Sequence, residues 1–225
     1  MSGSWGRNIR LSIFGESHGA AVGLVLDGLE PGFKLDMEKI KQQMRRRSPG
    51  LDELSSPRKE QDQFELLSGI YNGITTGTPI GILIRNIDQR SEDYEKEGII
   101  FRPSHADHTG WVKYKGFNDP RGGGHFSGRL TAAVVCAGAI AMQFLEKEGI
   151  QIGSHILKAG NTDSISTLDD PLSLDDLLEL KTSDFPVRDE GIRDSMVREI
   201  MSAKAGGDSL GGVVEVIALG LSSGI

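Results

Sequence analysis

A serine–histidine pair lies in a turn-like segment near the start of the chain, at residues 14–19 (FGESHG). An imidazole titrates near pH ~6.5, so His18 could act as a general acid or, as the cation, bind a phosphate. Ser17 is its direct neighbour, and adjacent residues on a turn seldom orient a hydroxyl onto the neighbouring ring. We therefore interpret His18 as an acid or an anion ligand rather than as half of a hydrolase, with a turn histidine of no special role as the alternative.

A second histidine segment covers residues 102–108 (RPSHADH). His105, Asp107 and His108 could bind a metal, as in a metal-dependent hydrolase, but their spacing is loose and no cysteine or second histidine pair supports such a site. An acid–base His105 with Arg102 binding an anion fits as well, and a plain polar loop is the remaining interpretation. We predict no metal site.

The strongest local signal is at residues 121–129 (RGGGHFSGR), directly before a helical pattern. Three glycines let the backbone approach a ligand closely, and a helix N-terminus adds partial positive charge. Arg129 would add a charge-assisted contact to a phosphate or carboxylate. The segment is neither a Walker sequence nor a dinucleotide fingerprint. It predicts an anion site, with a flexible hinge before a packed helix as the alternative.

Apolar periodicity predicts an α+β protein. No repeat or strong linker divides the sequence, so we expect one domain over residues 1–225. Residues 86–121 are expected to form a long irregular loop, which is typical of a functional segment. Strands are expected at residues 9–14, 22–26, 64–70, 80–84, 150–157 and 213–219, and helices at 36–47, 127–148, 174–180 and 187–205.

Composition narrows the class of partner. The net charge is −7, which argues against bulk nucleic-acid binding, whereas the run Arg45–Arg47 suits a small anionic ligand. The single cysteine, Cys136, lies in an apolar run and is typical of a reducing compartment, so the cytoplasm is expected. The apolar stretch at residues 130–145 is short for a bilayer span and predicts a buried helix rather than a membrane segment.

Together and in this order, the segments resemble the chorismate synthase family. No single motif is decisive, but seven in sequence order make coincidence a poor explanation. The matching stretches are residues 14–19 (FGESHG), 45–50 (RRRSPG), 75–79 (TTGTP), 86–94 (NIDQRSEDY), 102–107 (RPSHAD), 121–129 (RGGGHFSGR) and 208–212 (DSLGG).

The resemblance implies a reaction and an assembly. Members of the family convert 5-enolpyruvylshikimate 3-phosphate to chorismate by 1,4-anti elimination of phosphate and a ring hydrogen. They require reduced FMN although the reaction has no net redox change, and NADPH would be an indirect reductant. The implied fold is a β–α–β sandwich, and the implied assembly of the full-length protein is a homotetramer.

The resemblance also implies roles for individual residues. His18 would protonate the leaving phosphate, and His105 would protonate the reduced flavin. The substrate carboxylate and phosphate would be bound by Ser17, Arg47, Arg102 and Arg129. The flavin would be contacted by Arg47, His125, Phe126 and Ser127.

The sequence departs from the family pattern in three places and in length. Many members have Arg-Ser-Ser-Ala-Arg at residues 125–129, an arginine where Glu53 stands, and a glycine where Ser104 stands; Arg58 or Lys59 could replace the arginine. Family members continue well past Ile225, so we expect the chain to be the N-terminal portion of the domain, incomplete at its C-terminus. The alternative function is a truncated, inactive paralogue or fragment that only binds phosphorylated ligands.

Overall fold

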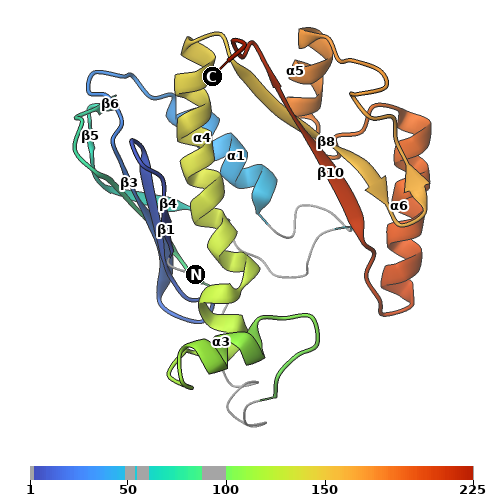
Figure 1. Ribbon diagram of the computed structural model, residues 1–225, viewed down its shortest axis with the longest axis horizontal. Helices are drawn as coiled ribbons and strands as arrows, with labels where there is room; N and C mark the ends of the chain where they lie inside the picture. Colours follow the sequence, from blue (N-terminus) through green and yellow to red (C-terminus); the bar gives the residue numbers. More distant parts are fainter. Residues whose placement is uncertain (1–2, 49–53, 55–60, 88–99, 225) are drawn as a thin grey trace. The chain divides into compact units, whose positions relative to one another are not determined.

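The computed structural model describes residues 3–48, 54, 61–87 and 100–224 (Figure 1). The described residues form two compact units. The first unit contains the described residues up to Ala141, except Leu54, and the second contains Leu54 and the residues from Met142 onward. Every described residue to which a catalytic or binding role was assigned above belongs to the first unit.

The first unit is built on a five-stranded sheet with the order β1-β2-β3-β7-β4, in which every neighbouring pair is antiparallel. Its strands are β1 (Ser4–Trp5), β2 (Arg10–Gly15), β3 (Ala21–Asp27), β4 (Phe64–Ser68) and β7 (Ile80–Arg85). The hairpin of β5 (Ile70–Tyr71) and β6 (Ile74–Thr75) follows β4. The strand expected at residues 64–70 is thus interrupted at Gly69, whose φ of +82° turns the chain out of the extended conformation.

Alternation along β3 and β7 places one apolar face of this sheet in the core. Val22, Leu24 and Leu26 stand directly opposite Ile84, Ile82 and Ile80, and all six side chains are buried. Because a strand has a side-chain period of two, this register fixes which residues face the core. In Figure 1, α1 and the first turns of α4 lie on one side of the sheet.

Helix α1 (Met37–Arg47) begins where the sequence predicted it. The Asp36 carboxylate accepts hydrogen bonds from the Glu38 and Lys39 amides, which caps the helix N-terminus. Ile40 and Met44 are buried one turn apart. The three arginines occupy the last turn, where the helix dipole favours cations, and α1 delivers Arg47 at its end.

Helix α4 (Thr131–Lys147) follows two short 3₁₀ segments, η1 (Arg121–Phe126) and η2 (Gly128–Leu130). Residues 128–147 are long and apolar enough to cross a membrane by length and composition, and half of them are buried within the protein. The core helix of a globular protein can have the same length and apolar composition, and Cys136 and Ile140 of α4 are fully buried. The expected buried helix is confirmed.

The stretch expected to be irregular contains a short helix, α3 (Asp107–Lys113). Its sequence includes Thr109 and Gly110, which are poor helix formers, so local propensity gave no signal. Tertiary packing supports the helix instead: a Cβ built on Gly110 would lie 2.6 Å from the Phe126 ring. The expectation of a wholly irregular loop was therefore wrong for these residues, while residues 88–99 lie outside the described part of the chain.

The second unit is a three-stranded antiparallel sheet, in the order β10-β8-β9, with two helices. Leu177 of the first helix packs on Gly153, where a Cβ would collide with it, and both residues are buried. The predicted helices and the two long strands are confirmed here. The elements are β8 (Gln151–Ala159), β9 (Thr162–Asp163), α5 (Leu174–Thr182), α6 (Glu190–Ala205) and β10 (Gly212–Leu219).

Candidate functional site

The three glycines of η1 bring two histidine segments together. Gly122, Gly123 and Gly124 have φ values of +57°, +87° and +52°, a left-handed conformation that costs L-residues roughly 1–2 kcal/mol each. A Cβ on Gly122 would overlap the His18 ring, and one on Gly123 would lie 2.5 Å from Cε1 of His105. Both imidazoles therefore lie against the same glycine loop, although 87 residues separate them in the sequence (105 − 18).

Backbone hydrogen bonds hold the His18 turn against this loop. The Ser17 amide donates to the Gly124 carbonyl over 3.1 Å, and Ser17 is 2% exposed. The side-chain amide of Asn86 donates to the carbonyls of Glu16 and Gly19 over 2.9 and 2.8 Å. The turn is thus tied to both the glycine loop and the segment that follows β7, which fixes the backbone on either side of His18.

His105 is oriented by a carboxylate that an arginine also binds. Its Nδ1 lies 2.5 Å from Oδ1 of Asp107, and Arg102 donates to the same carboxylate over 2.8 and 2.9 Å. Hydrogen bonds from Arg102 hold the pKa of Asp107 well below its usual range, so the carboxylate is ionised at neutral pH. An ionised carboxylate at Nδ1 orients the imidazole ring relative to the glycine loop.

These contacts remove support for a metal-dependent hydrolase. Asp107 is bonded to Arg102 and His105, and the His108 ring packs edge-on against Phe101 at 5.3 Å. Over the described residues, no three His, Cys, Asp or Glu side chains are arranged to hold a metal ion.

Arg47 and Arg129 meet at a carboxylate that sequence reasoning missed. Asp62 is buried and forms an ion pair with each of the two guanidinium groups. Arg129 also donates to Asn86 Oδ1 over 2.8 Å and to the Arg85 carbonyl over 3.0 Å. Arg129 is 4% exposed, whereas the Arg47 side chain is 20% exposed. The structure brings the two arginines together, and their substrate-binding roles stay predictions.

The three residues that follow the glycines have different surroundings: His125 and Phe126 line a pocket, and Ser127 caps η2. Nδ1 of His125 lies 3.0 Å from the Gly15 carbonyl oxygen. Because a carbonyl oxygen can only accept a hydrogen bond, Nδ1 is the donor. Phe126 packs near Tyr114 with the ring centroids 6.0 Å apart. The Ser127 hydroxyl accepts from the Arg129 amide and caps η2. Flavin contact by these three residues stays a prediction.

His125 and Phe126 line a pocket of 540 Å³ in the first unit. Burial and the neighbouring Asp119 carboxylate raise the pKa of Glu16 in its wall. Hydrogen bonds from Arg121 lower the pKa of Asp119. The pocket wall therefore holds two neighbouring carboxyl groups whose pKa values are shifted in opposite directions. Its lining residues are Gly3, Ile13, Phe14, Gly15, Glu16, Tyr114, Phe117, Asn118, Asp119, His125 and Phe126.

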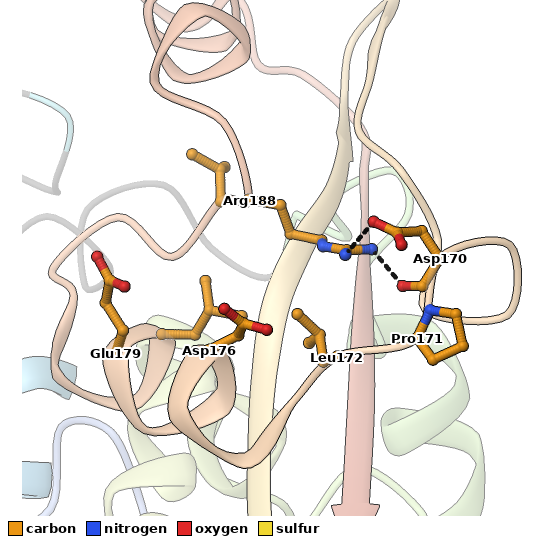
Figure 2. Close-up of a pocket in the computed structure, with 8 residues that line it drawn as sticks. Asp170, Pro171, Leu172, Asp176, Glu179 and Arg188 are labelled. Carbon is orange, nitrogen blue, oxygen red and sulfur yellow. Dashed lines mark hydrogen bonds and ion pairs between the residues drawn. The ribbon is translucent and has the colours of Figure 1, made fainter.

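A second pocket, of 340 Å³, lies in the second unit and contains none of the predicted residues (Figure 2). Its arginine, Arg188, donates to the Asp170 carboxylate over 2.6 Å and to the Asp170 carbonyl over 2.8 Å. Asp176 and Glu179 add two further carboxylates. With its cation already paired and three acidic groups in its wall, this pocket does not suit a phosphorylated ligand.

The sequence did not indicate three residues of the site: Asp62, which pairs with both arginines; Asn86, which holds the His18 turn; and Asp119, which lines the pocket. Asp62 stands between two glutamines in a polar stretch, which reads as surface, and only the tertiary structure buries it. Its φ of +48° is uncommon for a residue other than glycine, but no sequence pattern indicates it. Glu53, Arg58, Lys59 and the motif at residues 88–94 lie outside the residues that the structure describes.

Fold and site together define an α+β protein in which two imidazoles and Arg102 lie against one glycine loop. The chorismate synthase family model matches residues 9–225, and the chain belongs to this family. It is 41% identical to the chorismate synthase of Thermococcus kodakarensis over 98% of this chain and 59% of the relative. It is 43% identical to that of Pyrococcus abyssi over 98% of this chain and 60% of the relative.

A solved structure agrees with the sequence comparison. A chorismate synthase crystal structure matches 96% of this chain and 58% of its own chain, with a TM-score of 0.73 and 31% identity. The predicted fold class, α+β of the chorismate synthase type, is confirmed. The chain spans about three fifths of the length of the curated relatives that it matches.

Proposed function

We propose that the protein catalyses the conversion of 5-enolpyruvylshikimate 3-phosphate to chorismate with reduced FMN, and that residues 1–225 are the N-terminal portion of one chorismate synthase domain. The observation that carries the proposal is the packing of His18 and His105 on one glycine loop, with Arg102 bonded to the second imidazole's carboxylate partner. Membership of the chorismate synthase family supports assigning the two histidines and Arg102 to the same reaction.

The residues present are compatible with a flavin. The pocket of 540 Å³ lies within the usual range of ligand sites, roughly 300–1,000 Å³, and has aromatic walls from Phe14, Tyr114 and Phe126. Oδ1 of Asn118 is buried there without a hydrogen-bond partner among the described residues, so it could accept from a ring N–H. We propose that His125 and Phe126, which line this pocket, contact the flavin there, and that Ser127 and Arg47, which do not line it, contact parts of the flavin outside it.

In the proposed reaction phosphate leaves with the electron pair of its carbon–oxygen bond. The electron pair of the ring carbon–hydrogen bond passes into the rearranged ring double bonds, and the hydrogen leaves as a proton to a base that is not among the residues assigned here. Reduced flavin, when bound, would supply electron density to the substrate as its carbon–oxygen bond breaks. His18 gives a proton to the leaving phosphate oxygen, and Ser17 holds the turn that aims it. His105, held at Nδ1 by Asp107, would be the proton donor beside the flavin. Arg47, Arg102 and Arg129 compensate the negative charge of the substrate.

The proposal extends to the setting of the reaction. NADPH would serve as an indirect reductant of the flavin, the full-length protein would be a homotetramer, and the enzyme would work in the cytoplasm without nucleic acid or membrane. These statements rest on the family and on the acidic composition.

The test is anaerobic formation of chorismate with reduced FMN by the protein expressed from its complete reading frame. His18→Ala and His105→Ala should each lower kcat by about 10²–10⁴-fold, which is the usual contribution of a positioned acid or base. His108→Ala is the matched control, because His108 packs on Phe101 and is not bonded to the Arg102–Asp107 pair. Near-normal turnover in the first two variants would remove their assigned roles.

A second candidate is a fragment or paralogue that binds phosphorylated ligands without turnover. The glycine loop with Arg102 beside Gly123 could bind an anion whether or not turnover follows. Binding of 5-enolpyruvylshikimate 3-phosphate by calorimetry with no chorismate formed would select this candidate.

A further inference from the structure

We propose that Asp62 and Asn86 are positioning residues, which join the arginine pair to the His18 turn through one continuous set of hydrogen bonds. The inference deepens the proposed function and rests on it for the roles of Arg47 and His18. Neither Asp62 nor Asn86 need touch the substrate. Their contribution is to fix where the anion is held relative to the imidazole that protonates it.

Asp62 is the arginine end of this set. Its carboxylate is buried, one oxygen binds Arg47, and the other binds Arg129. A buried carboxylate without cationic partners would be strongly unfavourable, so the two arginines and Asp62 require one another. Because Arg47 remains partly exposed at the end of α1, Asp62 restrains a cation that can still face a ligand.

Asn86 is the histidine end. Its Oδ1 accepts from Nε of Arg129 over 2.8 Å, and its Nδ2 donates to the carbonyls of Glu16 and Gly19. These two carbonyls flank Ser17 and His18 on both sides. Both polar atoms of the Asn86 amide therefore form hydrogen bonds. A side chain without the oxygen would lose the contact with Arg129, and one without the nitrogen would lose the contacts with the two carbonyls.

The two ends predict different kinetic effects. A change at Asp62 alters the position of Arg47 and should weaken substrate binding. A change at Asn86 that spares the contact with Arg129 alters only the His18 turn and should lower the rate of the chemical step. A merely structural role would instead lower thermal stability and the active fraction without this division between KM and kcat.

The experiment uses the protein from its complete reading frame, with reduced FMN. Asn86→Asp keeps an oxygen for Arg129 and replaces the donor to both carbonyls, so kcat should fall about 10- to 100-fold while KM stays within about twofold. Asp62→Glu keeps the charge but lengthens the side chain, so KM should rise about tenfold with a smaller change in kcat. Glu65→Gln is the control, because its carboxylate pairs with Arg85 at an exposed position in the same sheet.

Hydrogen exchange supplies a readout that needs no activity. Amides of residues 15–20 should exchange faster in Asn86→Asp than in the wild type, and Glu65→Gln should not change them. If Asn86→Asp does not fold, Asn86→Ser removes both the donor to the two carbonyls and the oxygen that accepts from Arg129 without adding charge, so its readout is the exchange at residues 15–20 alone. Unchanged kcat and unchanged exchange in a folded Asn86 variant would overturn the inference. An inactive wild-type protein would overturn the proposed function, while the exchange measurement would still decide the connection.

Discussion

Replacing Gly123 with alanine tests whether the glycine loop positions His105. The new Cβ would lie 2.5 Å from His105 Cε1 and 2.8 Å from Nε2. Carbon atoms in contact are about 3.5–4.0 Å apart, so the ring must move by roughly 1 Å. A displacement of about 1 Å at a reacting group can cost about 10²-fold in rate. We therefore expect kcat for chorismate formation to fall about 100-fold in Gly123→Ala.

The same substitution should destabilise the fold. Gly123 has a φ of +87°, and a left-handed conformation costs an L-residue roughly 1–2 kcal/mol, to which the collision with His105 adds. Urea unfolding gives the change in free energy. Gly128→Ala is the control, because a Cβ at Gly128 meets nothing within 4 Å and its φ is not in the left-handed region.

A double variant separates the two contributions. In Gly123→Ala/His105→Ala the ring that the methyl group strikes is absent, so the combined loss of stability should be smaller than the sum of the single losses. Only the backbone cost of the alanine would remain. Additive losses, or wild-type turnover in Gly123→Ala, would show that the loop does not pack on His105 in the way described.

Three further predictions concern stability and reactivity. Hydrogen bonds from Ser166, Thr167 and His155 lower the pKa of Glu215 to about 2. The ionised Glu215 side chain therefore stabilises the fold above pH ~4.3, and this stabilisation is lost as the pH falls through 2. In acid titrations followed by circular dichroism, Glu215→Gln should lose less stability over that pH range than the wild type. Burial raises the pKa of Cys136 to about 12, so a thiol reagent at pH ~8 should modify it only on unfolding, and rapid native labelling would contradict its burial. Ser104 has a φ of +61°, so Ser104→Gly should stabilise the protein by about 0.5–1 kcal/mol in urea unfolding, and a loss would contradict strain there.

Local sequence patterns were sufficient for most elements. The α1 boundary followed from Asp36 as a cap and from Ile40 and Met44 on one face, since both signals lie within a few residues of each other. Helix α3 did not follow, because Gly110 gives it low propensity and its support comes from Phe126, 16 residues further on (126 − 110).

The site divides in the same way. The sequence by itself determined which side chains could do the chemistry, because the histidines, arginines and glycines occur in short recognisable segments, and it indicated the family to which the chain belongs. Only the tertiary structure decided that His18 and His105 share one loop and that Arg47 and Arg129 share Asp62. The physical reason is that burial and pairing of a charge depend on the side chains that the fold brings around it, which short segments of sequence do not contain.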